Sequence, residues 1–243
     1  MNFKNILKEE ESIFKQDDLK PAVILLLAAL IPTLHRYFGS AEFYINITDV
    51  ATVTHHTKSL PANIYFFLSA LFLMGVIPLL IIKYFLKERI GDYGLRIGNW
   101  KTGLVSIAIL FPVIAIAILL PAVYQQELKD FYPFYKGTGE SVGSFLEFEL
   151  WRGLLFYTAW EFFFRGFLLF GLRKFVGDGI AIMVQIIPSC LWHIGYPTGE
   201  ILMSIPAGMM FGIIALRTNS IIWVWFLHWL IGMGLDVFII LSK

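Results

Sequence analysis

Four ionisable side chains lie in stretches that are otherwise strongly apolar: Glu161, Arg165, His193 and His228. An ionisable group at membrane depth is costly, so each of the four is a candidate functional residue. Glu161 and Arg165 are four residues apart and therefore share a helix face. Arg165 can hold Glu161 ionised through a charge-assisted hydrogen bond.

One carboxylate and two imidazoles fit two chemistries. In the first, Glu161 is a general base that takes a proton from water, and His193 helps to hold that water. His228 then donates a hydrogen bond to the oxyanion of a tetrahedral intermediate, which amounts to peptide-bond hydrolysis without a covalent intermediate. In the second, Glu161 and the two histidines ligate a divalent metal, as in zinc sites with two histidines and a glutamate. The first is favoured and needs no cofactor; a divalent metal stays the alternative.

The composition is that of a membrane protein. Hydrophobic residues make up 58% of the 243 residues and charged residues 15%, with a mean hydropathy of +0.72; a soluble domain has about 25% charged residues. The net charge of +1 and the lack of a basic patch argue against nucleic acid as a partner. The single cysteine, Cys190, excludes an intrachain disulfide framework and a cysteine zinc site. We expect an integral, multi-pass protein of the cell membrane, with the lipid bilayer as its first partner.

Seven stretches are candidates for membrane spans, which take about 20 mostly apolar residues in a helix. They are residues 21–38, 64–82, 103–123, 145–172, 179–192, 201–216 and 221–241. The apolar runs are long and do not alternate, which argues against strands. No linker divides the chain and no internal repeat is visible. The sequence therefore predicts an all-α, polytopic helix bundle, with a single domain over residues 1–243 and a motif-bearing core at about 145–241.

Loop charges and helix lengths predict how the spans are arranged. With the N-terminus inside, thirteen Lys and Arg residues fall in inner segments and four in outer ones, which favours an N-in, C-out topology. At about 1.5 Å rise per residue, Glu161, His193 and His228 then reach a similar depth. This holds only if the fourth helix continues past Arg165 to about Leu172, which we predict.

Several other polar or small residues have structural interpretations. Glu149 and Arg152, three residues apart, are expected to form an interfacial ion pair. His35 and Arg36 are interpreted as anchors at the outer interface, and Asp236 as a residue towards the outer surface. Gly208 and Gly212 form a small-xxx-small pair that indicates close helix packing.

Three segments around the candidate residues read like family motifs. Residues 160–166 read WEFFFRG, residues 189–193 read SCLWH, and residues 228–232 read HWLIG. In order, spacing and placement on successive spans, this resembles the CAAX prenyl protease and bacteriocin-processing family of intramembrane endopeptidases, also called CPBP or Abi. That family's motifs are Glu-Glu-x-x-x-Arg, Phe-x-x-x-His and His-x-x-x-Asn. The segment GLRIG at 94–98 also looks like the family.

The resemblance implies an intramembrane endopeptidase acting on hydrophobic or lipidated peptides, such as prenylated CAAX tails or bacteriocins. It implies that a glutamate pair and the first histidine activate water, and that the second histidine and the Asn stabilise the oxyanion. Glu161, Arg165, His193 and His228 carry over. The departures are Trp160 for the first glutamate, Ser189 for the Phe and Gly232 for the Asn.

These departures keep other functions open. One is a catalytically inactive protein of the same fold that binds a lipidated peptide or acts as an immunity factor. Another is a transporter with a proton relay through Glu161 and the histidines; it is disfavoured because no inverted repeat or broken helix pair is visible. We favour retained protease activity, because both histidines and the arginine remain and each is costly in lipid.

Overall fold

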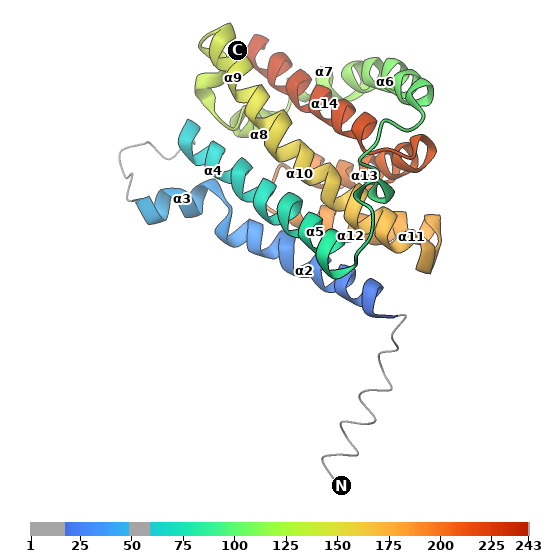
Figure 1. The fold of residues 1–243 in the computed structure, drawn as a ribbon. Coiled ribbons are helices and arrows are strands. Elements are labelled where there is room, and N and C mark those ends of the chain that lie inside the picture. Colours follow the sequence, from blue (N-terminus) through green and yellow to red (C-terminus); the bar gives the residue numbers. More distant parts are fainter. Residues whose placement is uncertain (1–17, 49–58, 243) are drawn as a thin grey trace.

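The computed structural model describes residues 18–48 and 59–242, and within these ranges it consists of helices and loops (Figure 1). The predicted all-α bundle is confirmed. The elements are α2 (Leu19–Phe38), α3 (Ala41–Thr48), α4 (Leu60–Ala70), η2 (Leu71–Val76), α5 (Ile77–Leu80), η3 (Ile81–Phe85), η4 (Ile90–Tyr93), α6 (Trp100–Ile114), η5 (Ala115–Leu119), α7 (Leu120–Ala122), α8 (Gln126–Phe131), η6 (Lys136–Gly139), α9 (Val142–Trp151), η7 (Arg152–Tyr157), α10 (Thr158–Glu161), η8 (Phe162–Phe170), α11 (Gly171–Val176), α12 (Asp178–Trp192), α13 (Thr198–Thr218) and α14 (Ile222–Leu241).

Several of these elements join end to end into longer helices. In the described part of the chain, six continuous helices are long and apolar enough to cross a membrane: Leu19–Phe38, Leu60–Phe85, Trp100–Ala122, Val142–Val176, Thr198–Thr218 and Ile222–Leu241. The remaining predicted span, the fifth at residues 179–192, corresponds to α12, which is apolar but has only 15 residues. At about 1.5 Å per residue it is roughly 22 Å long, shorter than the hydrocarbon core of about 30 Å.

The helix Val142–Val176 forms the centre of the bundle. In its most apolar window 83% of the residues are buried, against at most 33% in the other five helices. In Figure 1 it runs between α4–α5 on one side and α14 on the other, and it also contacts α12. The helix continues past Arg165 to Val176, as predicted. Its polar side chains are therefore shielded from lipid by the surrounding helices.

The connection before α6 ties the last two helices together. The Asn99 amide donates to the Thr218 carbonyl at 2.7 Å, and the Ile221 amide donates to the Gly94 carbonyl at 3.0 Å. Gly98 has φ +58°, and a Cβ there would lie 2.1 Å from the Thr218 oxygen. The backbone therefore passes too close to the α13–α14 turn for any residue other than glycine.

Small residues let α12 and α13 approach closely. A Cβ added at Gly208 would lie 2.9 Å from a side-chain carbon of Ile186, and one added at Gly212 would lie 3.1 Å from Ile182. These contacts match the helix-packing role predicted from the glycine spacing. The close approach brings the beginning of α13 near the end of α12.

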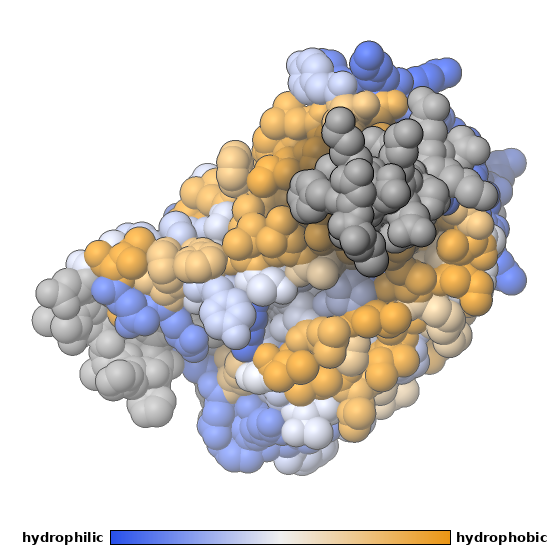
Figure 2. Space-filling model, turned by 90° about the horizontal axis from the view of Figure 1, so that it is seen from below, coloured by the Kyte–Doolittle hydropathy of each residue, from blue (hydrophilic) through white to orange (hydrophobic). Residues whose placement is uncertain are grey.

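The outer face is apolar, as a protein in lipid requires. Figure 2 shows broad hydrophobic surfaces over the side seen from below. Large side chains such as Leu26, Phe72 and Ile116 are more than half exposed. The chain is thus a multi-pass integral membrane protein. Five of the lysines used for the orientation lie outside the described residues: Lys4, Lys8, Lys15, Lys58 and Lys243.

Candidate active site

The central helix carries Tyr157, Glu161 and Arg165 at intervals of four residues. Residues with this spacing lie on one helix face. The helix packs against α14, which supplies His228, and against α12, which His193 directly follows. Three helices therefore bring the predicted residues into one region of the bundle.

Glu161 is fully buried and joins two cationic or potentially cationic partners. Its Oε1 accepts a hydrogen bond from Arg165 Nη1 at 3.2 Å and lies 2.6 Å from His228 Nδ1. Its Oε2 is buried and has no hydrogen-bond partner among the described residues. The carboxylate thus fixes the orientation of both Arg165 and His228, and the pairing with Nδ1 leaves His228 Nε2 as the free ring nitrogen.

His193 directly follows α12. Its Nδ1 lies 2.7 Å from the Ser189 carbonyl oxygen, which can only accept, so Nδ1 carries a proton and donates. Its Nε2 is left as an acceptor and lies 3.9 Å from Glu200 Oε1. The rings of His193 and Trp160 pack in a T-shaped arrangement, with centroids 5.3 Å apart and planes at 80°. The indole that stands in the place of the first motif glutamate is therefore buried beside this histidine.

Glu200 was not among the residues singled out from the sequence. It lies in the first turn of α13, where a carboxylate is favoured by the helix dipole. The Tyr132 hydroxyl donates to both of its oxygens at 2.8 Å. Burial, followed by the nearby Glu200 charge, raises the pKa of Tyr132 well above its ordinary value, so this hydroxyl stays a donor.

A sequence signal for Glu200 exists in the connector length. Only the residues 193–197 separate the end of α12 from the start of α13. A connection this short forces two antiparallel helices to meet at this end. A polar side chain in the first turn of α13 then lies near His193. Its place at the end of a predicted span, however, is typical of a charge at the membrane interface.

These side chains line a cavity of about 220 Å³ inside the bundle. Its polar lining includes Tyr132, Tyr157, Arg165, His193, Glu200 and His228. Its apolar lining includes Leu119, Leu128, Met203, Phe211, Ile231 and Leu235. The cavity combines a small set of convergent polar groups with an apolar wall, which is the pattern of a ligand-binding site.

Gly232 and Tyr157 share one space in this cavity. A Cβ added at Gly232 would lie 2.0 Å from the Tyr157 hydroxyl oxygen. The rings of Tyr157 and His228 are close, with centroids 4.5 Å apart. The hydroxyl therefore occupies the space into which a side chain at position 232, the third-motif Asn position, would extend.

A second buried charge cluster lies next to Tyr157. Arg152 pairs with Glu149 at 2.8 Å and with Asp236 at 3.1 Å, and all three residues are at most 1% exposed. The predicted Glu149–Arg152 pair exists and is buried within the bundle. Asp236 is likewise buried, and it pairs with Arg152 of the central helix.

The structure brings Glu161, Arg165 and His228 into direct contact. His193 lines the same cavity, and the carboxylate within ion-pairing range of it is Glu200. His35, interpreted as an anchor, is buried instead and accepts a hydrogen bond from Trp192 at 3.2 Å. Within residues 18–48 and 59–242, no group of three or more His, Cys, Asp or Glu side chains is arranged to hold a metal ion.

A family comparison matches this part of the chain. The model described as "Type II CAAX prenyl endopeptidase Rce1-like" covers residues 148–233. We call residues 148–233 the Rce1-like segment, after the model to which they are similar. The resemblance predicted from the motifs is confirmed, and the match supports a CAAX-type intramembrane endopeptidase in general terms. Searches of curated proteins and of solved structures each found no match.

The Rce1-like segment runs from α9 in the central helix to α14. It contains both histidines of the site, the Glu161–Arg165 pair and Glu200. Tyr132, which donates to Glu200, lies outside it.

Proposed function

We propose that this chain is an intramembrane endopeptidase that hydrolyses peptide bonds of membrane-associated substrates through a carboxylate-activated water. One observation carries the proposal: two histidines, an arginine and a carboxylate line a single cavity within a bundle of apolar helices. Such groups are costly at membrane depth unless they are used. The Rce1-like match over the same helices supports the proposal independently.

In this proposal His228, supported by Glu161 and Arg165, stabilises the negative charge that develops on the substrate. His228 donates from Nε2 to the oxyanion of the tetrahedral intermediate. Glu161, paired with Nδ1, orients the ring for this donation, just as a carboxylate orients histidine in other hydrolases. Arg165 holds the Glu161 carboxylate in place.

Tyr157 supplies a second donor to the oxyanion. No hydrogen bond engages its hydroxyl within the described part of the chain, and Tyr157 lines the cavity beside His228. The hydroxyl fills the space at Gly232, where the family motif has an Asn side chain. A phenol can donate to an oxyanion as an amide does.

The proposed substrates are hydrophobic or lipidated peptides, including prenylated CAAX tails and bacteriocin-type peptides. The apolar part of the cavity lining, with Leu119, Met203 and Phe211, suits an aliphatic chain. The polar part suits the scissile peptide group.

The alternative is an inactive protein that holds a lipidated peptide in the same cavity. Trp160 and Gly232, which replace two motif residues, favour it. It differs from the proposal in one consequence: a Glu161→Ala variant would keep its biological effect, whereas filling the cavity would abolish that effect.

A cleavage assay in liposomes tests the proposal. The substrates are a farnesylated peptide ending in a CAAX sequence and a non-lipidated hydrophobic peptide. We expect cleavage of at least one by the wild type, and a loss of about 100-fold or more in His193→Ala and His228→Ala, the size of a general acid–base or oxyanion contribution. The exposed variant Glu147→Gln serves as the control. No cleavage by the wild type would reject the protease, and equal cleavage by all variants would reject the proposed site.

A further inference from the structure

The family motif expects a carboxylate from the central helix beside the first histidine, but Trp160 stands in that place and packs against His193. The neighbouring Glu161 contacts His228 and Arg165. We propose that Glu200, at the start of α13, is the general base that activates the attacking water. This assignment rests on the endopeptidase function proposed above.

The geometry between Glu200 and His193 fits a bridging water. Nδ1 of His193 is used by the Ser189 carbonyl, so Nε2 faces Glu200 as an acceptor. His193 Nε2 and Glu200 Oε1 are both acceptors and lie 3.9 Å apart, so they form no direct hydrogen bond. Both can accept from one water that lies between them. Such a water donates one hydrogen to Nε2 and the other to Glu200 Oε1, leaving its lone pairs free for attack.

The carboxylates of Glu200 and Glu161 differ in their access to water. The Glu200 side chain is 25% exposed and the His193 side chain 14%, whereas Glu161 is fully buried. Glu161 does not line the cavity, whereas Arg165 and His228, the two side chains that contact its carboxylate, do. Glu200 lines the cavity directly, so it can reach a water that attacks a peptide held there.

Their partners also differ in charge. Glu161 Oε1 is already engaged by the Arg165 guanidinium and by the His228 ring. Glu200 is held by a neutral donor, the Tyr132 hydroxyl, which fixes its position without supplying a positive charge. Glu200 is therefore the better placed of the two to accept a proton.

The reaction step balances as follows. The water O–H bond breaks, its proton passes to Glu200, and the oxygen forms a bond to the peptide carbonyl carbon. The carbonyl π electrons move to the oxygen, where His228 and Tyr157 donate. When the intermediate collapses, the C–N bond breaks and Glu200 returns the proton to the leaving amine. The products are a carboxylic acid and an amine, and no oxidant or co-reactant is needed.

The experiment compares Glu200→Gln, Glu200→Ala and Glu200→Asp in the liposome assay with the farnesylated CAAX peptide. Removing a general base costs 10²- to 10⁴-fold in rate, and we expect a loss of about that size in kcat for the Gln variant. KM should change little, because Gln retains the side-chain volume. Glu200→Asp should retain more activity than Gln. Added formate should restore part of the rate of Glu200→Ala, because a small carboxylate can enter the vacated space.

Glu127→Gln is the matched control. Glu127 is an exposed carboxylate near the same end of α13, where it accepts from the Thr198 amide at 3.1 Å, and it does not line the cavity. The cleavage rate of Glu127→Gln should equal that of the wild type. Formate should accelerate neither the Glu127→Gln variant nor the wild type. Thermal unfolding in detergent checks that each variant is folded.

The outcomes separate this assignment from the function. Wild-type cleavage that Glu200→Gln retains would overturn Glu200 as the base and leave the endopeptidase standing. Loss of activity in Glu200→Ala without formate rescue, together with a lowered unfolding temperature, would make Glu200 structural and also overturn the assignment. Absence of cleavage by the wild type would remove the function and this inference together.

Discussion

At the residue scale, the site is divided between two carboxylates that serve different histidines. Glu161 contacts His228 from within the central helix, and Glu200 lies opposite the free nitrogen of His193 from α13. Each histidine therefore has its own partner. The proposed activation of water and stabilisation of the oxyanion then use different histidines that line one cavity.

The Tyr157 hydroxyl gives a prediction at this scale. If it donates to the oxyanion, Tyr157→Phe should lower kcat by about 100-fold, the loss seen when one such donor is removed. KM should stay near the wild-type value, since the hydroxyl acts on charge that develops only in the transition state. Kinetics with the farnesylated peptide measure this.

Tyr124→Phe removes the same group at a side chain that is 87% exposed and should have no effect. A Tyr157→Phe enzyme as fast as the control would show that the hydroxyl merely fills the space at Gly232.

The cost of placing charge in lipid allowed Glu161, Arg165, His193 and His228 to be chosen from the sequence. The same criterion missed Glu200, because it lies at the end of a span, where charges are common. It also could not foresee that Asp236 would lie inside the bundle, since only the packing of α14 against the central helix brings it to Arg152.

At the element scale, the position of the turn between α13 and α14 decides where Glu200 and His228 lie relative to each other. The segment 94–99 fixes this turn. Its backbone bonds to Thr218 and Ile221, and Trp223 donates to the Ile97 carbonyl at 2.7 Å. This gives the family-like sequence GLRIG a structural role.

Replacing Gly98 should therefore destabilise the protein. Gly98→Ala forces a left-handed backbone on a residue with a Cβ, which costs about 1–2 kcal/mol, and it adds a contact of 2.1 Å with the Thr218 oxygen. We expect a lower unfolding temperature in detergent and lower activity.

Gly91→Ala is the control for this change. A Cβ at Gly91 would meet nothing within 4 Å, and its φ is not in the left-handed region. An equal effect of both substitutions would contradict the role given to the close approach at Gly98.

Periodicity and hydropathy predicted the helices well because bilayer thickness sets their length. The whole predicted fourth span, residues 145–172, lies within the observed helix Val142–Val176. The local π-helical turns at η7 and η8 were not predicted, since they depend on how neighbouring side chains pack and not on composition.

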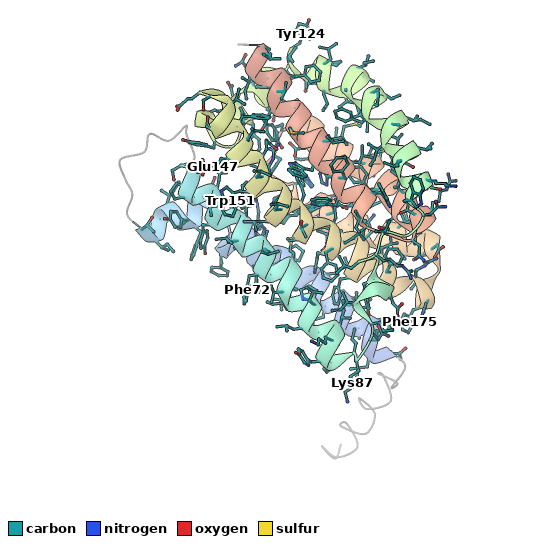
Figure 3. The ribbon with its side chains drawn as sticks, turned by 45° about the horizontal axis from the view of Figure 1, so that its top comes forward. Phe72, Lys87, Tyr124, Glu147, Trp151 and Phe175 are labelled. Atoms are coloured by element: carbon teal, nitrogen blue, oxygen red, sulfur yellow. The ribbon has the colours of Figure 1, made fainter. Side chains whose placement is uncertain are left out.

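At the scale of the whole molecule, the two ends of the bundle carry different residues. Figure 3 places Tyr124 and Glu147 at one end and Lys87 and Phe175 at the other. The N-in, C-out topology assigns the Tyr124 end to the outside. This topology stays a prediction, since several of its lysines lie outside the described residues.

Cysteine labelling tests the orientation. In a Cys190→Ser background, Tyr124→Cys should react with a membrane-impermeant maleimide in intact cells. Lys174→Cys, next to Phe175, should react only after permeabilisation. The unmodified Cys190→Ser protein controls for background labelling, and the reverse pattern would invert the topology.

The Tyr132–Glu200 hydrogen bonds have a consequence for how the protein can be divided. Tyr132 belongs to the stretch between the third and fourth long helices, ahead of the Rce1-like segment 148–233. A fragment cut to that segment would keep both histidines and yet lose the hydroxyl that holds the Glu200 carboxylate. The set of residues that builds the candidate site is thus larger than the segment that carries its family signature.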